Sequence, residues 1–79
     1  MDRRLYVAEY AAPLDDAAAL TLRRCFEVRE VRWVKRYRLE DREWSVLEAE
    51  SADFVRGAHR SAEVAFVGVW PAEELAIPG

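Results

Sequence analysis

The residues of this chain that could carry chemistry are few and lie far apart in the sequence. They are one histidine, one cysteine and three charged residues set among apolar neighbours: His59, Cys25, Glu9, Lys35 and Glu48. A neutral imidazole can bind a transition metal or transfer a proton near neutral pH, and carboxylates can add oxygen ligands. The chain has no Ser-His-Asp arrangement and no cysteine cluster, and its three glycines form no phosphate-binding loop. These residues favour binding over catalysis.

The histidine and the cysteine each have a structural interpretation as well. His59 follows Val55 by four residues, at the border of an apolar helical stripe, which favours a histidine hydrogen-bonded to backbone over a metal ligand or an acid-base group. Cys25 falls on the apolar stripe of a predicted helix and is expected to pack as a small hydrophobic side chain. A single cysteine forms no internal disulfide, which fits a reducing cytoplasm.

The elements that must position these residues follow from periodicity. Strand-like character covers 3–10, helical spacing covers 14–28, two strands cover 30–39 and 43–50, a short helix starts after the N-cap Ser51, and a last strand covers 66–70. The order β-α-β-β-α-β predicts an α+β, ferredoxin-like sandwich. We expect one domain over residues 1–79, with a four-stranded antiparallel sheet that carries both helices on one face.

Strict alternation along the two central strands predicts two different sheet faces. One face is rich in aromatics: Val31, Trp33, Lys35, Tyr37, Leu39, Trp44, Val46, Glu48 and Glu50. The other has smaller residues at its centre and is expected to meet the helices: Arg32, Val34, Arg36, Arg38, Ser45, Leu47 and Ala49. An apolar patch as large as the first face usually marks an interface. We therefore predict a homodimer through it, because nothing else in so small a domain covers those rings.

Two charges sit among the aromatics of that face. Lys35 and Glu48 would need each other if buried, so a cross-strand ion pair at the interface rim is one interpretation. The other is a polar pocket in an apolar wall, the usual composition of a small-ligand site, near Glu9 and Trp33.

The charge distribution and the hydropathy limit which classes of partner the protein can have. Residues 23–38 carry seven Arg or Lys against two Glu, whereas 39–79 carry nine acids against three Arg. The third strand, "EWSVLEAE", is acidic at both ends and would repel a phosphate backbone, so a nucleic-acid partner is not expected. No apolar run approaches the roughly 20 residues that cross a bilayer, and the start lacks a signal peptide. We expect a cytoplasmic protein without a membrane partner.

Four stretches carry a resemblance to a known family. "YVAEYAAPL", "VRWVKRY", "REWSVLEAE" and "VRGAHRSA" resemble a small ferredoxin-like family of unknown function that includes bacterial nickel-binding proteins, over nearly the whole chain. The resemblance implies a cytoplasmic homodimer in which Glu9, Trp33, Tyr37 and Glu48 match the family's strand residues. His59 falls where many relatives carry a histidine or a neighbouring basic residue in helix two. This chain departs from the family in having one His, none in helix one, and Ala62-Glu63 where a glycine usually ends helix two.

The sequence thus predicts a homodimeric, non-enzymatic binding protein for a transition metal, with nickel as the candidate, or for a small ligand. The expected ligand-binding residues are Glu9, Trp33, Lys35, Tyr37 and Glu48, with His59 as the metal ligand. One imidazole with carboxylates completes a metal site only if a dimer brings two copies together. The alternatives are a small enzyme of the dimeric α+β barrel type, resembling isomerases or monooxygenases, and a purely structural dimer.

Overall fold

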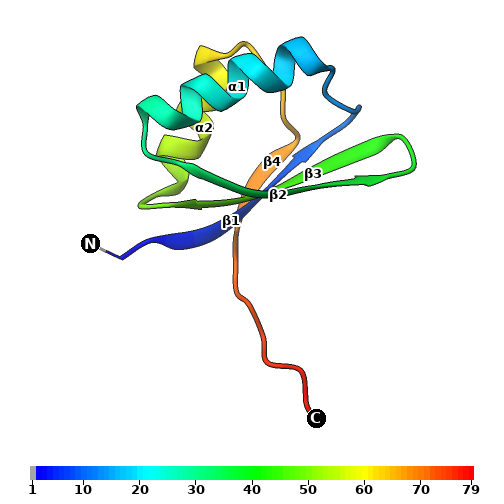
Figure 1. Cartoon of the computed structure of the whole chain (residues 1–79), viewed down its shortest axis with the longest axis vertical. Helices are drawn as coiled ribbons and strands as arrows, with labels where there is room; N and C mark the ends of the chain where they lie inside the picture. Colours follow the sequence, from blue (N-terminus) through cyan, green and yellow to red (C-terminus); the bar gives the residue numbers. More distant parts are fainter. Residues whose placement is uncertain (1) are drawn as a thin grey trace.

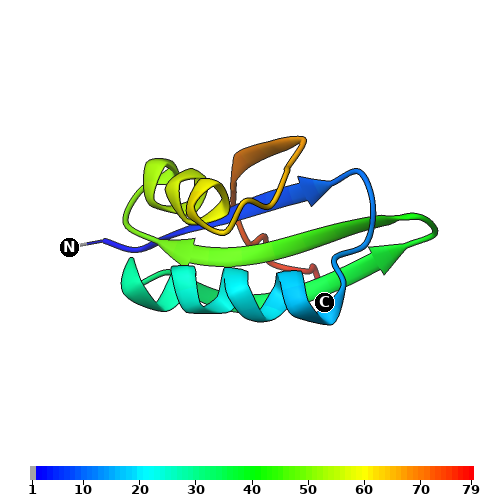
Figure 2. The same cartoon turned by 90° about the horizontal axis from the view of Figure 1, so that it is seen from above.

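The computed structural model describes residues 2–79. Its elements are β1 (Arg4–Tyr10), α1 (Asp16–Val28), β2 (Arg32–Leu39), β3 (Arg42–Ala49), α2 (Ala52–Ser61) and β4 (Gly68–Ala72). The strands form one antiparallel sheet in the order β2-β3-β1-β4, and both helices lie on the same side of it (Figures 1 and 2). The predicted ferredoxin-like α+β fold is confirmed.

Both helices begin at a side chain that satisfies free backbone amides. The carboxylate of Asp15 accepts a hydrogen bond from the Ala18 amide at 2.7 Å, and the Ser51 hydroxyl accepts one from the Phe54 amide at 3.4 Å. Such caps each contribute about 1 kcal/mol to a helix. The predicted N-cap Ser51 is therefore confirmed, and the first helix starts at Asp16 rather than Leu14.

Both helices end in the same backbone motif, and a glutamate occupies its left-handed position. After α1, Glu30 has φ 56° and the Val31 amide bonds the Phe26 carbonyl; after α2, Glu63 has φ 57° and the Val64 amide bonds the His59 carbonyl. These bonds define Schellman motifs, in which glycine is the usual left-handed residue. Each motif turns the following valine into the core, since Val31 and Val64 are both buried.

The β2–β3 hairpin closes in two residues although it lacks an Asn-Gly or Asp-Gly sequence. Leu39 pairs with Arg42 across the turn, and Glu40 takes φ 57°. A positive φ at a non-glycine residue is strained, so glutamate again supplies a conformation that glycine would supply more easily.

The core lies between the helices and one face of the sheet. Leu22 and Phe26 from α1 and Val55 from α2 meet sheet residues that include Leu47 and Tyr6. The predicted helix-facing residues of β3, Ser45, Leu47 and Ala49, are all fully buried. The faces of β3 are therefore as predicted.

The faces of β2 are only half as predicted, because the strand contains a register irregularity. Trp33 pairs with Leu47, but Lys35 pairs with Val46, so Val34 is an extra residue between them. An extra residue interrupts side-chain alternation. Val31 and Trp33 consequently face the helices, and Arg32 and Val34 face the opposite side, which corrects the prediction for all four. Beyond the bulge, Lys35 and the residues at 37 and 39 point away from the helices as expected.

The last strand begins and ends two residues later than predicted. β4 covers Gly68–Ala72 and includes Pro71, which a strand tolerates here because β4 is at the edge of the sheet. After Ala72 the chain leaves the sheet on the side opposite the helices and extends away from the domain (Figure 1). Within residues 2–79, no helix is long and apolar enough to cross a membrane.

Candidate functional site

The sheet face turned away from the helices, here called the open face, is the main candidate site. Its aromatic residues are Tyr37 on β2, Trp44 directly opposite on β3, and Trp70 on β4. The Tyr37 and Trp70 residues are 51% and 45% exposed. The sequence predicted two Trp and one Tyr on this face, and the structure has that number with Trp70 in place of Trp33.

A hollow lies on the open face where the C-terminal segment leaves β4. Its volume is about 320 Å³, and its lining is mostly apolar: Leu5, Val7, Val34, Lys35, Tyr37, Val46, Ala72, Glu73 and Glu74. A cavity of this size with a few polar groups suits a small ligand. Of the predicted ligand-binding residues, Lys35 and Tyr37 come together here.

The two predicted carboxylates of the open face are held by arginines outside the hollow. Glu9 accepts an ion-pair contact from Arg42 at 3.0 Å, and Glu48 lies 3.8 Å from Arg32. The predicted Lys35–Glu48 pair is wrong, because the bulge places Arg32 opposite Glu48. Lys35 has no ion-pair partner within 4.0 Å among residues 2–79.

Trp70 is a site residue that the sequence reasoning missed. Its ring lies over Gly68, since a Cβ at position 68 would overlap the indole. The signal was present in the alternation of "GVW", in which Val69 is buried and its neighbours must point the other way. Glycine at this point lets the indole lie flat against the sheet.

Trp33, predicted for the ligand site, belongs to the core side of the sheet. Its indole Nε1 donates to the Ser45 hydroxyl at 3.0 Å, and its ring meets Phe26 edge-on with centroids 5.1 Å apart. These two contacts hold β2 against β3 and α1 just before the bulge. The predicted position of Trp33 in the wall of a ligand site is therefore wrong.

His59 is fully buried and both of its ring nitrogens are engaged. Nδ1 lies 2.7 Å from the Val55 carbonyl, so it is the protonated nitrogen and donates this bond. Nε2 then accepts from the Tyr10 hydroxyl at 2.6 Å. Burial lowers the pKa of His59, and the bond to Val55 only partly opposes this. The histidine hydrogen-bonded to backbone, which the sequence favoured over a metal ligand, is what the structure shows, deeper in the core than expected.

The surroundings of His59 are aromatic rather than ligating. Phe66 and Phe26 lie with ring centroids 5.0 and 5.3 Å from the imidazole. Burial also raises the pKa of Tyr10 to about 12. Across the part of the chain that the structure describes, no three His, Cys, Asp or Glu side chains come together as metal ligands. In this conformation the imidazole has no nitrogen free for a metal.

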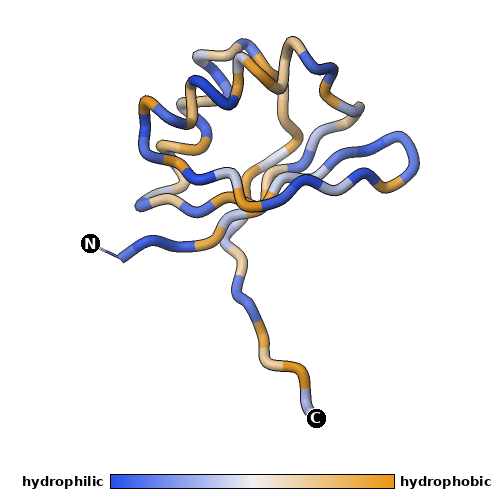
Figure 3. The backbone as a smooth tube through the Cα atoms, viewed as in Figure 1, coloured by the Kyte–Doolittle hydropathy of each residue, from blue (hydrophilic) through white to orange (hydrophobic). Residues whose placement is uncertain are grey.

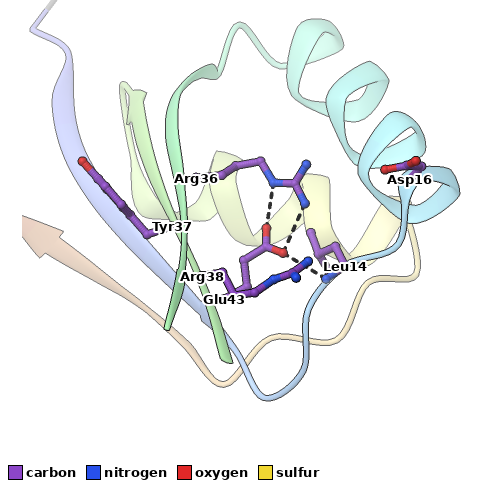
Figure 4. Close-up of a pocket in the computed structure, with 6 residues that line it drawn as sticks. All are labelled: Leu14, Asp16, Arg36, Tyr37, Arg38 and Glu43. Atoms are coloured by element: carbon purple, nitrogen blue, oxygen red, sulfur yellow. Dashed lines mark hydrogen bonds and ion pairs between the residues drawn. The ribbon is translucent and has the colours of Figure 1, made fainter. Parts of the chain in front are cut away.

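A second polar site lies on the helix side of the sheet, around a buried carboxylate that the sequence reasoning did not single out. Glu43 accepts two hydrogen bonds from Arg36, at 2.8 and 3.1 Å, and one from the Leu14 amide at 3.0 Å (Figure 4). Burial acts to raise the pKa of Glu43, but these bonds outweigh it and the pKa is lowered.

The contacts of Glu43 give the site a structural role. They tie the β2–β3 hairpin to the loop before α1, beside a hollow of about 460 Å³. Tyr37, although it borders this hollow, points to the other side of β2 (Figure 4). Both carboxylate oxygens of Glu43 accept hydrogen bonds from groups of the protein itself. The carboxylate therefore links two elements rather than acting as a free acid.

Comparison with known proteins supports the fold. No family model matches the chain, and no curated protein matches it. A solved structure described as that of an unknown protein from Galdieria sulphuraria is similar, with a TM-score of 0.69 and 14% identity over 98% of this chain and 49% of that one. This chain thus spans about half the length of that protein. At this identity the likeness shows the fold alone, and membership of the nickel-binding family stays a prediction.

Proposed function

We propose that this protein is a homodimeric binding protein in which two open faces meet and enclose the hollow beside Lys35 and Tyr37. The observation that carries the proposal is the uncovered aromatic surface of one sheet face. Tyr37, Trp44 and Trp70 lie there with a hollow between β2 and the start of the C-terminal segment. Apolar surface of this kind is stabilised by burial at about 25 cal/mol per Å².

A second copy fits this face because the four charged residues beside its aromatic centre form two neutral pairs. The pairs Glu9–Arg42 and Arg32–Glu48 flank the aromatic centre and carry no net charge. A strongly acidic or strongly basic partner would gain little from such a surface, whereas a second identical face meets no like-charge repulsion from neutralised pairs. The polar rim around an apolar centre is also the usual anatomy of an interface.

The hollow indicates the class of ligand. Its walls are mostly aliphatic, with the Tyr37 ring at one side, and its charged groups are Lys35, Glu73 and Glu74. An apolar molecule with one anionic group would bury its hydrocarbon part against the aliphatic walls and place its charge at Lys35, whereas the two carboxylates would oppose any further negative charge. Burial inside a dimer would strengthen that charge interaction by excluding water.

The dimer is tested by analytical ultracentrifugation at micromolar concentration. We expect a species of twice the 9.1 kDa chain mass, and we expect Trp70→Asp to shift it toward monomer. Phe54→Asp is the matched control, because Phe54 is 42% exposed on α2, in the helix layer. A wild-type monomer, or equal effects of the two variants, would overturn the proposal.

Ligand binding is tested with an apolar anionic fluorophore, 1-anilinonaphthalene-8-sulfonate, on the wild-type dimer. Lys35→Met keeps the length of the side chain and removes its charge, so we expect about a tenfold weaker affinity if a desolvated ion pair is lost. Arg60→Met, on the exposed side of α2, is the control. Equal affinity of both variants and the wild type would show that Lys35 does not bind the anion.

Nickel binding and the enzyme alternative are not part of this proposal. His59 uses both nitrogens within the core, and no observation on the open face favours a reaction. Both stay predictions from the sequence.

A further inference from the structure

Three charged side chains on the walls of the open-face hollow have no ion-pair partner in the protein. Lys35 on β2 borders the hollow, and so do Glu73 and Glu74 just after β4, where the C-terminal segment is hydrophilic as it leaves the sheet (Figure 3). None of the three forms an ion pair within 4.0 Å among residues 2–79. The hollow thus presents unpaired charges of both signs.

The positive and the negative charges lie on opposite walls of the hollow. Lys35 belongs to β2, and Glu73 follows directly on Ala72, the last residue of β4. Since β2 and β4 are the two edges of the sheet, three strand spacings separate the walls, roughly 14 Å. Side chains stand roughly perpendicular to a sheet, so the charged groups keep about this separation. The lysine and the glutamates are therefore too far apart to neutralise one another.

The floor between the two walls is aliphatic. Lys35 pairs with Val46 on β3, and Val46 pairs with Val7 on β1. Leu5, two residues before Val7, pairs with Ala72 at the end of β4. The residues of β1 and β3 that border the hollow are these three aliphatic ones alone. A molecule that lies across the strands therefore meets a charge at each end and hydrocarbon between them.

A ligand with a single anionic end would satisfy only one of the two walls. It would pair with Lys35, but it would also remove water from Glu73 and Glu74 without giving them a partner, and such desolvation of a charge is unfavourable. A cationic group at the other end of the ligand would supply that partner. Charge-assisted hydrogen bonds are about twice as strong as neutral ones, so a ligand with both charges fits the hollow best.

The separation of the walls limits the length of the ligand. Of the roughly 14 Å between the charged groups, a hydrogen bond of about 3 Å at each end leaves about 8 Å for the ligand itself. An extended chain of six carbons that ends in a nitrogen spans about 7.5 Å at ordinary bond lengths. The hollow is therefore matched to a short aliphatic chain with a charge at each end.

From these observations we infer that the hollow binds a zwitterion, a molecule in which an aliphatic chain of about six carbons joins a carboxylate to an ammonium group. Lys35 binds the carboxylate, and Glu73 and Glu74 bind the ammonium group. The inference rests on the ligand site of the proposed function, because it concerns the same hollow. It adds the specificity of that site, since the two glutamates favour a ligand with a cationic end.

The specificity is tested by nuclear magnetic resonance titration of the full chain with two probes that differ only at one end, 6-aminohexanoate and hexanoate. The double variant Glu73→Gln, Glu74→Gln keeps the size of both side chains and removes their charge. We expect it to raise the dissociation constant of 6-aminohexanoate about tenfold, as for the loss of hydrogen bonds to a charged group. The constant of hexanoate should stay equal or fall, because the variant removes a repulsion. An unchanged constant for 6-aminohexanoate, or an equal rise for both probes, overturns the inference.

Two further variants serve as controls in the same titration. Glu40→Gln, Asp41→Asn makes the same change in net charge at two exposed residues of the turn between β2 and β3, which do not border the hollow. It should leave both dissociation constants unchanged, and an effect equal to that of the glutamate variant would overturn the inference. Lys35→Met should raise both constants, because both probes carry the carboxylate.

The outcomes separate this inference from the proposed function. If neither probe binds, or if Lys35→Met changes neither constant, the ligand site of the proposed function fails and the zwitterion with it. If Lys35→Met raises both constants but the glutamate variant changes neither, the zwitterion alone is overturned. If sedimentation shows that the glutamate variant dissociates the dimer, the two carboxylates bind the second copy rather than a ligand, and the zwitterion is again overturned.

Discussion

At the scale of single residues, His59 is held neutral by burial rather than by a charged neighbour. Its partners are the Tyr10 hydroxyl and the Val55 carbonyl, and neither compensates a positive charge on the ring as a carboxylate would. The imidazole links β1 to α2 through neutral hydrogen bonds, which contribute to stability only while the ring stays uncharged.

This arrangement predicts acid sensitivity near pH 6. Because the pKa of His59 is lowered in the folded state, the unfolded chain binds the proton first as the pH falls below about 6.5. The stabilisation is therefore complete above that pH and is progressively lost below it. We expect the free energy of unfolding, measured by urea titration, to fall between pH 6.5 and 5.

The matching variant is His59→Gln, which removes the titrating group. It should be less stable than the wild type at pH 7.5, by about 1–3 kcal/mol for disturbed buried hydrogen bonds, but nearly independent of pH in this window. An equal pH dependence in both proteins would place its origin elsewhere. Glu43 cannot mimic the effect, since its lowered pKa confines its loss of stabilisation to pH below about 4.5.

Glu63 is a second residue whose environment leads to a prediction. It holds φ 57° after α2, a conformation that costs an L-residue roughly 1–2 kcal/mol and glycine almost nothing. Glu63→Gly should raise the free energy of unfolding by about 0.5–1 kcal/mol, allowing for the greater freedom of glycine in the unfolded chain. Glu63→Ala keeps the Cβ and should give no gain. Equal effects of both in denaturant titration would contradict the strain argument.

At the scale of elements, the sequence predicted correctly those features that depend on residues close together in the chain. The N-cap at Ser51, the apolar stripe of α2 and the alternation in β3 are set by neighbours close in sequence, and all are found in the structure. The same holds for the order of strands and helices. These features fix the ferredoxin-like fold before any long-range contact is considered.

The features that sequence reasoning missed depend on contacts between elements. The bulge at Val34 reconciles two constraints: Trp33 faces the helices and bonds Ser45, and Arg36, three residues later, faces the same side and bonds Glu43. Strict alternation carries no information about either. As a result, Trp33 was assigned to the open face, and Glu48 was paired with Lys35 rather than Arg32.

Of the residues of the candidate site, some were placed correctly from the sequence and others were missed. Lys35 and Tyr37 were identified correctly as open-face residues because they follow the bulge, where the assumed phase is again right. Trp70 was missed because β4 was expected to end there, whereas the strand continues through Pro71. The clamp between Arg36 and Glu43 requires knowing that the hairpin lies beside the loop before α1.

At the scale of the whole molecule, the domain is one sheet covered on one side only. The helices form a single layer on one side of the sheet, and only the C-terminal segment leaves the sheet on the other side (Figure 1). A domain of 79 residues buries only about 60% of the surface its unfolded chain exposes. Assembly through the open face would supply the missing second cover.

The proposed dimer therefore predicts that stability depends on protein concentration. If folding is coupled to association, mass action favours the native dimer at higher concentration. We expect the midpoint of thermal unfolding, followed by circular dichroism, to rise by several degrees between about 2 and 200 µM for the wild type. Trp70→Asp should have a lower midpoint that does not change with concentration, because its open face no longer pairs. Phe54→Asp should keep the wild-type dependence, and a concentration-independent wild type would show that the one-sided sheet is stable alone.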